Sequence, residues 1–122
     1  MNSSYPFLSD AQVVQLIANA RLSQAAAVRD ELFDPPPVVK LFTPDAGATW
    51  LLSEIDPEVP GLAFGLCDLG LGFPELGYVS LDELAGVRGS IDLPIEQDLS
   101  FQGRQPLSAY AAQARLAGRI VA

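Results

Sequence analysis

The segment from Val38 to Leu84 most constrains the fold, because four short apolar stretches alternate there with turns marked by Pro, Gly and Asp. Apolar stretches of this length, bounded by such turn residues, are typical of β-strands. We therefore predict strands over residues 38–42, 48–55, 62–69 and 76–79. The connections between them are short, which favours antiparallel neighbours.

Helical signals lie on the N-terminal side of this segment. Ser9 and Gln12 form a capping box, in which each side chain accepts a hydrogen bond from a backbone N–H at the start of a helix. The apolar spacing that follows predicts a helix over residues 10–20, a break near Leu22 and a second helical piece that ends at Phe33. The three prolines after Asp34 then stop the helix, because proline lacks a backbone N–H.

A second capping box, at Ser80 and Glu83, predicts a short helix over residues 81–87. Residues 99–101 are expected to add an edge strand, and an Ala-rich apolar stripe predicts a C-terminal helix over residues 107–120. Together these elements predict an α+β architecture. Its mainly antiparallel sheet has four to five strands, with the N-terminal and C-terminal helices packed on one face.

The length of 122 residues suits one domain that buries its own core without a disulfide or a metal ion. We expect a single domain over residues 1–122, in which residues 1–8 are disordered, 9–33 helical and 38–80 form the sheet. The sequence has neither a secretory signal nor an apolar run long enough to cross a membrane. We therefore expect a cytoplasmic protein with no membrane partner.

Negative charge is concentrated in the part of the chain that forms the sheet. Residues 43–98 contain eleven acidic residues and one basic residue, Arg88, whereas the whole chain has a net charge of −8. Direct binding to nucleic acid is disfavoured, since such binding depends on Lys and Arg side chains that neutralise phosphates. Phosphate-rich ligands are disfavoured for the same reason.

The chain contains no histidine, which excludes catalytic Ser-His-Asp and Cys-His arrangements and zinc sites built from Cys and His. Cys67 has no imidazole partner and is interpreted as a small buried residue in a strand. The glycines at 65–77 match no phosphate-binding fingerprint. We assign no catalytic, cofactor-binding or metal-binding residue and expect no cofactor.

Carboxylates and two aromatic residues mark the surface that we consider for binding. Glu54 and Asp56 are expected on the same strand face, about 6.6 Å apart along the strand. Each carboxylate also has an ordinary interpretation as a solvated side chain, and each aromatic residue as part of the core. The candidate interaction surface consists of Trp50, Glu54, Asp56, Asp68, Glu75 and Tyr78.

Three strings of the sequence carry a resemblance: FTPDAGATWLLSEIDP at 42–57, FGLCDLGLGFPELGYVSLDEL at 64–84 and LPIEQDLSF at 93–101. They resemble a family of small uncharacterised bacterial proteins that is catalogued as a domain of unknown function. The resemblance implies no established activity, cofactor or set of catalytic residues. It implies a bacterial cytoplasmic protein, and some members are found on plasmids or integrated mobile elements.

Two classes of function remain open. The leading hypothesis is a non-enzymatic interaction module whose acidic surface on residues 43–98 binds a protein partner. A basic protein and a second copy of the chain are both candidates for that partner. A variant of it is DNA mimicry by an accessory protein of a mobile element. The alternative is a small enzyme, carboxylate-based or dependent on a divalent metal, with a cluster of Glu54, Asp56, Asp68 and Glu75.

Overall fold

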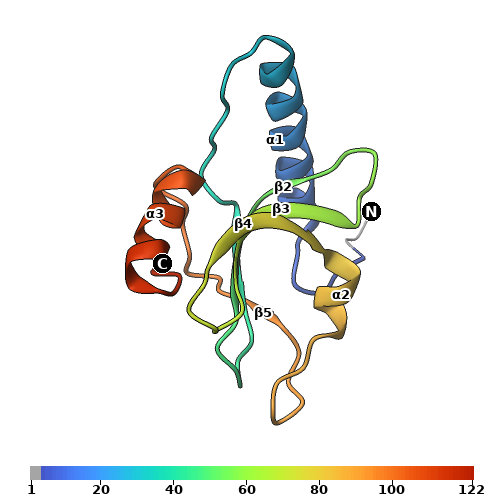
Figure 1. The fold of residues 1–122 in the computed structure, drawn as a ribbon. Helices are drawn as coiled ribbons and strands as arrows, with labels where there is room; N and C mark the ends of the chain where they lie inside the picture. Colours follow the sequence, from blue (N-terminus) through green and yellow to red (C-terminus); the bar gives the residue numbers. More distant parts are fainter. Residues whose placement is uncertain (1–3) are drawn as a thin grey trace.

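The structure, a computed structural model, describes residues 4–122 and contains a five-stranded antiparallel sheet in the order β4-β3-β2-β1-β5 (Figure 1). The α+β class and the antiparallel sheet are confirmed. The strands are β1 Val39–Phe42, β2 Thr49–Ile55, β3 Leu62–Asp68, β4 Glu75–Ser80 and β5 Glu96–Gln97. The helices are α1 Asp10–Val28, α2 Leu81–Gly86 and α3 Leu107–Ala117.

Both predicted helix starts are present. The Ser9 backbone N–H donates to Gln12 Oε1 at 2.9 Å, and the Gln12 backbone N–H donates to Ser9 Oγ at 3.2 Å. At the start of α2, the Glu83 backbone N–H donates to Ser80 Oγ at 3.2 Å. Side-chain acceptors of this kind stabilise a helix start by about 1 kcal/mol.

Helix α1 runs without interruption to Val28, so the predicted break near Leu22 and the helical piece to Phe33 are wrong. Three consecutive alanines at 25–27 have the highest helix propensity and continue the helix past Ser23. The helix ends where Asp30 adopts a φ of 56°. The N–H groups of residues 30 and 31 then bond to the carbonyls of residues 27 and 26, which forms a Schellman motif.

The two terminal helices cover opposite faces of the sheet, which corrects the prediction that both pack on one face. Leu16 of α1 belongs to a core cluster with Leu52 of β2. In a second cluster, Tyr110 of α3 packs with Leu51 of β2 and Leu66 of β3. Successive strand residues point to opposite faces, so the adjacent and fully buried Leu51 and Leu52 require cover on both faces.

The structure differs from the sequence predictions in three further places, near the N-terminus, at the edge strand and at the end of α3. Phe7 and Leu8 are buried in the α1 cluster, although residues 1–8 were expected to be disordered; residues 1–3 lie outside the described residues. The edge strand lies at β5 rather than at 99–101, because the Asp98 carboxylate accepts the Ser100 N–H and turns the chain. Helix α3 ends before 120, because Gly118 adopts a φ of 73°.

Among residues 4–122, no helix combines the length and the apolar character that a membrane crossing requires. The cytoplasmic location stays a prediction.

Candidate functional site

Helix α1 lies beside the end of β2, where β1 no longer pairs with it. The β1–β2 ladder ends at the pair Val39 and Leu52, so the backbone of Ser53 lies beyond it. The Asn19 side-chain amide of α1 donates to the Ser53 carbonyl at 2.9 Å. This bond satisfies a buried backbone acceptor that β1 does not reach. It also fixes the second half of α1 next to the residues that follow Ser53.

A β-bulge between Leu52 and Glu54 determines where the Glu54 side chain points. After the bulge, Glu54 pairs with Phe64 of β3, and Phe64 pairs with Tyr78 of β4. Residues that pair across antiparallel strands project to the same face. Glu54, Phe64 and Tyr78 therefore form one row across three strands. Without the bulge, strict alternation along β2 would place Glu54 on the same face as Trp50.

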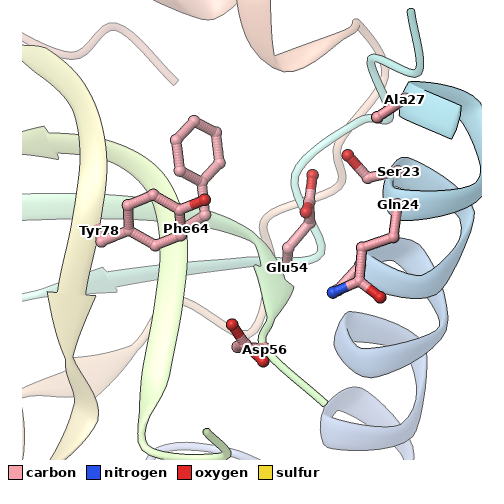
Figure 2. A pocket seen from close by; sticks show the side chains of 8 residues that line it. Ser23, Gln24, Ala27, Glu54, Asp56, Phe64 and Tyr78 are labelled. Carbon is pink, nitrogen blue, oxygen red and sulfur yellow. The ribbon is translucent and has the colours of Figure 1, made fainter. Parts of the chain in front are cut away.

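This row and α1 enclose a small pocket with a volume of about 170 Å³. Figure 2 shows the Phe64 and Tyr78 rings on one side, α1 on the other, and the Glu54 carboxylate between them. The two rings pack edge to face, with centroids 5.1 Å apart. Small residues of α1 leave the space open. The lining residues are Ala20, Ser23, Gln24, Ala27, Glu54, Asp56, Phe64 and Tyr78.

The two carboxylates of the pocket have different surroundings. Burial raises the pKa of Glu54, and a hydrogen bond with the Ser23 side chain partly opposes that rise. Asp56 Oδ1 accepts the backbone N–H groups of Glu58 at 2.8 Å and Val59 at 3.2 Å. These bonds fix the Asp56 carboxylate at the pocket rim, in the turn that follows β2. None of the lining residues carries a positive charge.

The six residues of the predicted surface lie in different parts of the structure. Glu54, Asp56 and Tyr78 line the pocket, as described. Trp50 is only 2% exposed and belongs to the α1 core cluster, so it is not part of any surface. Asp68 is 3% exposed, and Glu75 is exposed at the start of β4 but does not line the pocket. The predicted surface is therefore not one continuous surface.

Asp68 has a clear structural role. Its Oδ2 accepts the buried backbone N–H of Ile120 at 2.9 Å, and its Oδ1 accepts the N–H of Gly70 at 2.8 Å. These bonds connect the end of β3 to the segment after α3. The four carboxylates of the enzyme hypothesis therefore do not converge. Within the described part of the chain, no three Cys, Asp or Glu side chains come together as metal ligands.

The sequence analysis missed the contribution of α1 to the site. Ala20, Ser23 and Ala27 lie three or four residues apart, so they share one face of a continuous helix. The predicted break near Leu22 separated them. A stripe of small residues at this spacing is the signal that indicates a close approach to the sheet. Phe64, which also lines the pocket, was not among the six residues of the predicted surface.

The fold and the pocket define a small α+β protein with a carboxylate and aromatic pocket between a helix and the end of a sheet. The chain belongs to the family "Protein of unknown function (DUF2958)", whose model matches residues 7–121. Comparisons with curated proteins and with solved structures give no match.

Proposed function

We propose that this protein is an interaction module whose pocket binds a Lys or Arg side chain of a protein partner. The observation that carries the proposal is the lining itself: two carboxylates, Glu54 and Asp56, face the same pocket as the aromatic rings of Phe64 and Tyr78. Carboxylates form charge-assisted hydrogen bonds with cations, and aromatic faces attract them. The proposal narrows the acidic surface on residues 43–98 to one pocket.

The size of the pocket supports a single side chain as the ligand. Its volume of about 170 Å³ is smaller than the roughly 300–1,000 Å³ typical of sites for whole small molecules. Asp56 is already held in place by the turn that it caps, and Glu54 by Ser23. A bound cation therefore orders few additional groups, which limits the entropic cost of binding.

The expected affinity for an isolated side chain is weak. A hydrogen bond to a charged group contributes about 1.5–3 kcal/mol, and a cation–π contact at an exposed site about 0.5–1 kcal/mol. Their sum corresponds to a Kd on the order of 1–30 mM. A partner protein adds contacts outside the pocket, and the negative charge of residues 43–98 accelerates its approach.

NMR titration with N-acetyl-argininamide tests the proposal. We expect saturable shifts of the backbone amides of Ser23, Glu54 and Tyr78, and no such shifts with the neutral isostere N-acetyl-citrullinamide. Glu54→Gln combined with Asp56→Asn is expected to remove the saturable response. The matched control is Glu58→Gln combined with Glu75→Gln, which removes the same two charges outside the pocket. Equal responses of the control and the pocket variants to argininamide would refute the proposal.

A second candidate is acid–base catalysis by Glu54 and Asp56. The observation that favours it is that Glu54, whose pKa is raised by burial, lines the same pocket as a second carboxylate, since carboxylates in different environments can divide the roles of acid and base. Thermal unfolding with Mg²⁺, Ca²⁺ and Mn²⁺ tests its metal-dependent form. A rise in Tm that Glu54→Gln abolishes would favour the enzyme over the interaction module.

A further inference from the structure

Strand β4 forms an open edge of the sheet. It is six residues long and pairs with β3 on one side only; within residues 4–122, no segment pairs with its outer side. The opposite edge of the sheet is β5, which has only two residues. An open edge presents unpaired backbone N–H and C=O groups that a strand from another protein can bind.

The register identifies which backbone groups of β4 point outward. The Leu81 N–H donates to the Gly61 carbonyl at 2.8 Å, one position beyond the pair Leu62 and Ser80. Hydrogen-bonded and non-hydrogen-bonded pairs alternate along an antiparallel ladder. The backbone groups of residues 79, 77 and 75 therefore point towards β3. Those of Leu76, Tyr78 and Ser80 point away from the sheet.

Apolar side chains accompany these outward backbone groups. Tyr78 is 69% exposed and Leu76 is 39% exposed, and both project to the same sheet face. The loop before β4 exposes three more large apolar side chains, those of Leu69, Leu71 and Phe73. Exposed apolar groups at such density mark interaction sites in natural proteins.

The edge also lacks the usual features that prevent strand pairing. Residues 75–80 contain no Lys, Arg or Pro, and the β3–β4 register continues without a bulge from Leu62 to Cys67. Natural proteins protect long open edges with such features, because an unprotected edge recruits other strands. The only charge on β4 is that of Glu75, at its start.

We propose that β4 is the docking edge for an extended segment of a protein partner in which basic and apolar side chains alternate. Apolar side chains of this segment pack on Leu76 and Tyr78, and basic ones project to the face of Glu75. Charge complementarity argues for this occupant, since β4 carries a negative charge at Glu75 and residues 43–98 contain one basic residue against eleven acidic ones. A second copy of the chain has the same negative charge, so its pairing with this edge is opposed.

This inference rests on the proposed function only in taking the partner to be basic. Neighbouring strands lie about 4.8 Å apart, so an added strand lies roughly 14 Å from β2, which carries Glu54. The pocket and the edge share Tyr78, but the pocket carboxylates Glu54 and Asp56 belong to the pocket alone. Their tests can fail separately.

Hydrogen exchange of the backbone amides tests the edge, with the peptide acetyl-Lys-Val-Lys-Val-Lys-Val-Lys-amide as the probe. We expect rapid exchange at Leu76, Tyr78 and Ser80 in the free protein. With saturating peptide, exchange at these three residues should slow by about tenfold or more, as the outward N–H groups become bonded. Glu54→Gln should leave this protection unchanged, which separates a failure of the edge from a failure of the pocket.

Two control peptides separate strand addition from general attraction of charge. The first, acetyl-Glu-Val-Glu-Val-Glu-Val-Glu-amide, retains the alternation with reversed charge. The second, acetyl-Lys-Lys-Lys-Lys-Val-Val-Val-amide, retains composition and charge without alternation. Neither is expected to protect the three amides. Equal protection by the block peptide, or none by the alternating peptide, would overturn the proposal. So would a dimer in size-exclusion chromatography with light scattering that protects these amides without peptide.

A proline substitution provides a second readout. Leu76→Pro removes an outward N–H without removing a β3–β4 bond, which is the situation in which an edge strand tolerates proline. We expect the affinity for the alternating peptide to fall about tenfold, and less for the control Leu76→Ala, which retains the N–H. Equal affinities of the two variants would contradict strand addition. If Leu76→Pro does not fold, the exchange experiment on the wild-type protein decides alone.

Discussion

Replacing Gly65 with alanine tests the packing of the sheet that carries the pocket. A Cβ atom at Gly65 would lie 2.0 Å from the Leu51 carbonyl oxygen and 2.9 Å from Leu52 Cα. Both are backbone atoms of β2, so no side-chain rotation relieves the contact. Gly77 is the cross-strand partner of Gly65 in β4, and a Cβ there would meet no atom within 4 Å. Gly77→Ala is therefore the matched control.

The magnitude of the effect follows from this geometry. An ordinary contact requires β2 and β3 to separate by about 1 Å or more, and overpacking a core costs typically 1–3 kcal/mol. Because backbone must move, we expect Gly65→Ala to destabilise the protein by about 3 kcal/mol or more. Gly77→Ala is expected to be neutral or to stabilise by up to about 1 kcal/mol, because alanine restricts the unfolded chain.

Urea unfolding followed by the fluorescence of Trp50 measures the difference, since this buried residue is the only tryptophan in the chain. With m-values of about 1–3 kcal/mol/M, the Gly65→Ala midpoint should fall by on the order of 1–3 M. Midpoints of the two variants that agree within error would refute the close approach of β2 to Gly65.

Three further predictions concern groups with defined surroundings. Asp68→Ala should lower the free energy of unfolding by about 1–3 kcal/mol, because the buried N–H of Ile120 loses its acceptor. Glu75→Ala, at an exposed site, should change the free energy of unfolding by no more than about 0.5 kcal/mol. Urea unfolding compares the two variants. Burial makes Glu54 harder to ionise in the folded protein than in the unfolded protein. The contribution of this side chain to stability is therefore complete below its unfolded pKa, near 4.5, where it is protonated in both states. This contribution is lost as the pH rises through the folded pKa of Glu54. The stability of Glu54→Gln relative to wild type should therefore increase between pH 4 and pH 7, and no change would contradict the burial of Glu54. Burial also raises the pKa of the Cys67 thiol. Alkylation of Cys67 by iodoacetamide at pH 8 should therefore be slower in the folded protein than in the protein unfolded by urea. Equal rates would contradict the placement of Cys67 in the sheet.

Local patterns in the sequence predicted much of the fold. Turn residues between apolar stretches located the first four strands, and the serines at 9 and 80 located two helix starts. The arrangement of helices was harder to predict, because the sheet binds one helix on each face. The adjacent Leu51 and Leu52 were the available signal, since a strand that is covered on one face alternates polar and apolar residues.

The candidate site was predicted only in part. Glu54, Asp56 and Tyr78 were identified by residue type, and the pocket joins these three. Trp50 and Asp68 were misplaced because sequence spacing does not reveal a bulge, a tertiary hydrogen bond to Ile120 or the depth of the core. The α1 side of the pocket depends on a helix that continues past Ser23, and that continuation depends on packing against β2 as well as on local propensity.

The central claim is that a basic side chain occupies the pocket between Glu54 and Tyr78. The most direct measurement is a crystal structure of the protein soaked with N-acetyl-argininamide. We expect the guanidinium group within about 3 Å of a carboxylate oxygen of Glu54 or Asp56, with its plane against the ring of Phe64 or Tyr78. An empty pocket at a ligand concentration of about 100 mM, several times the expected Kd, would contradict the claim. So would a guanidinium bound only at other carboxylates.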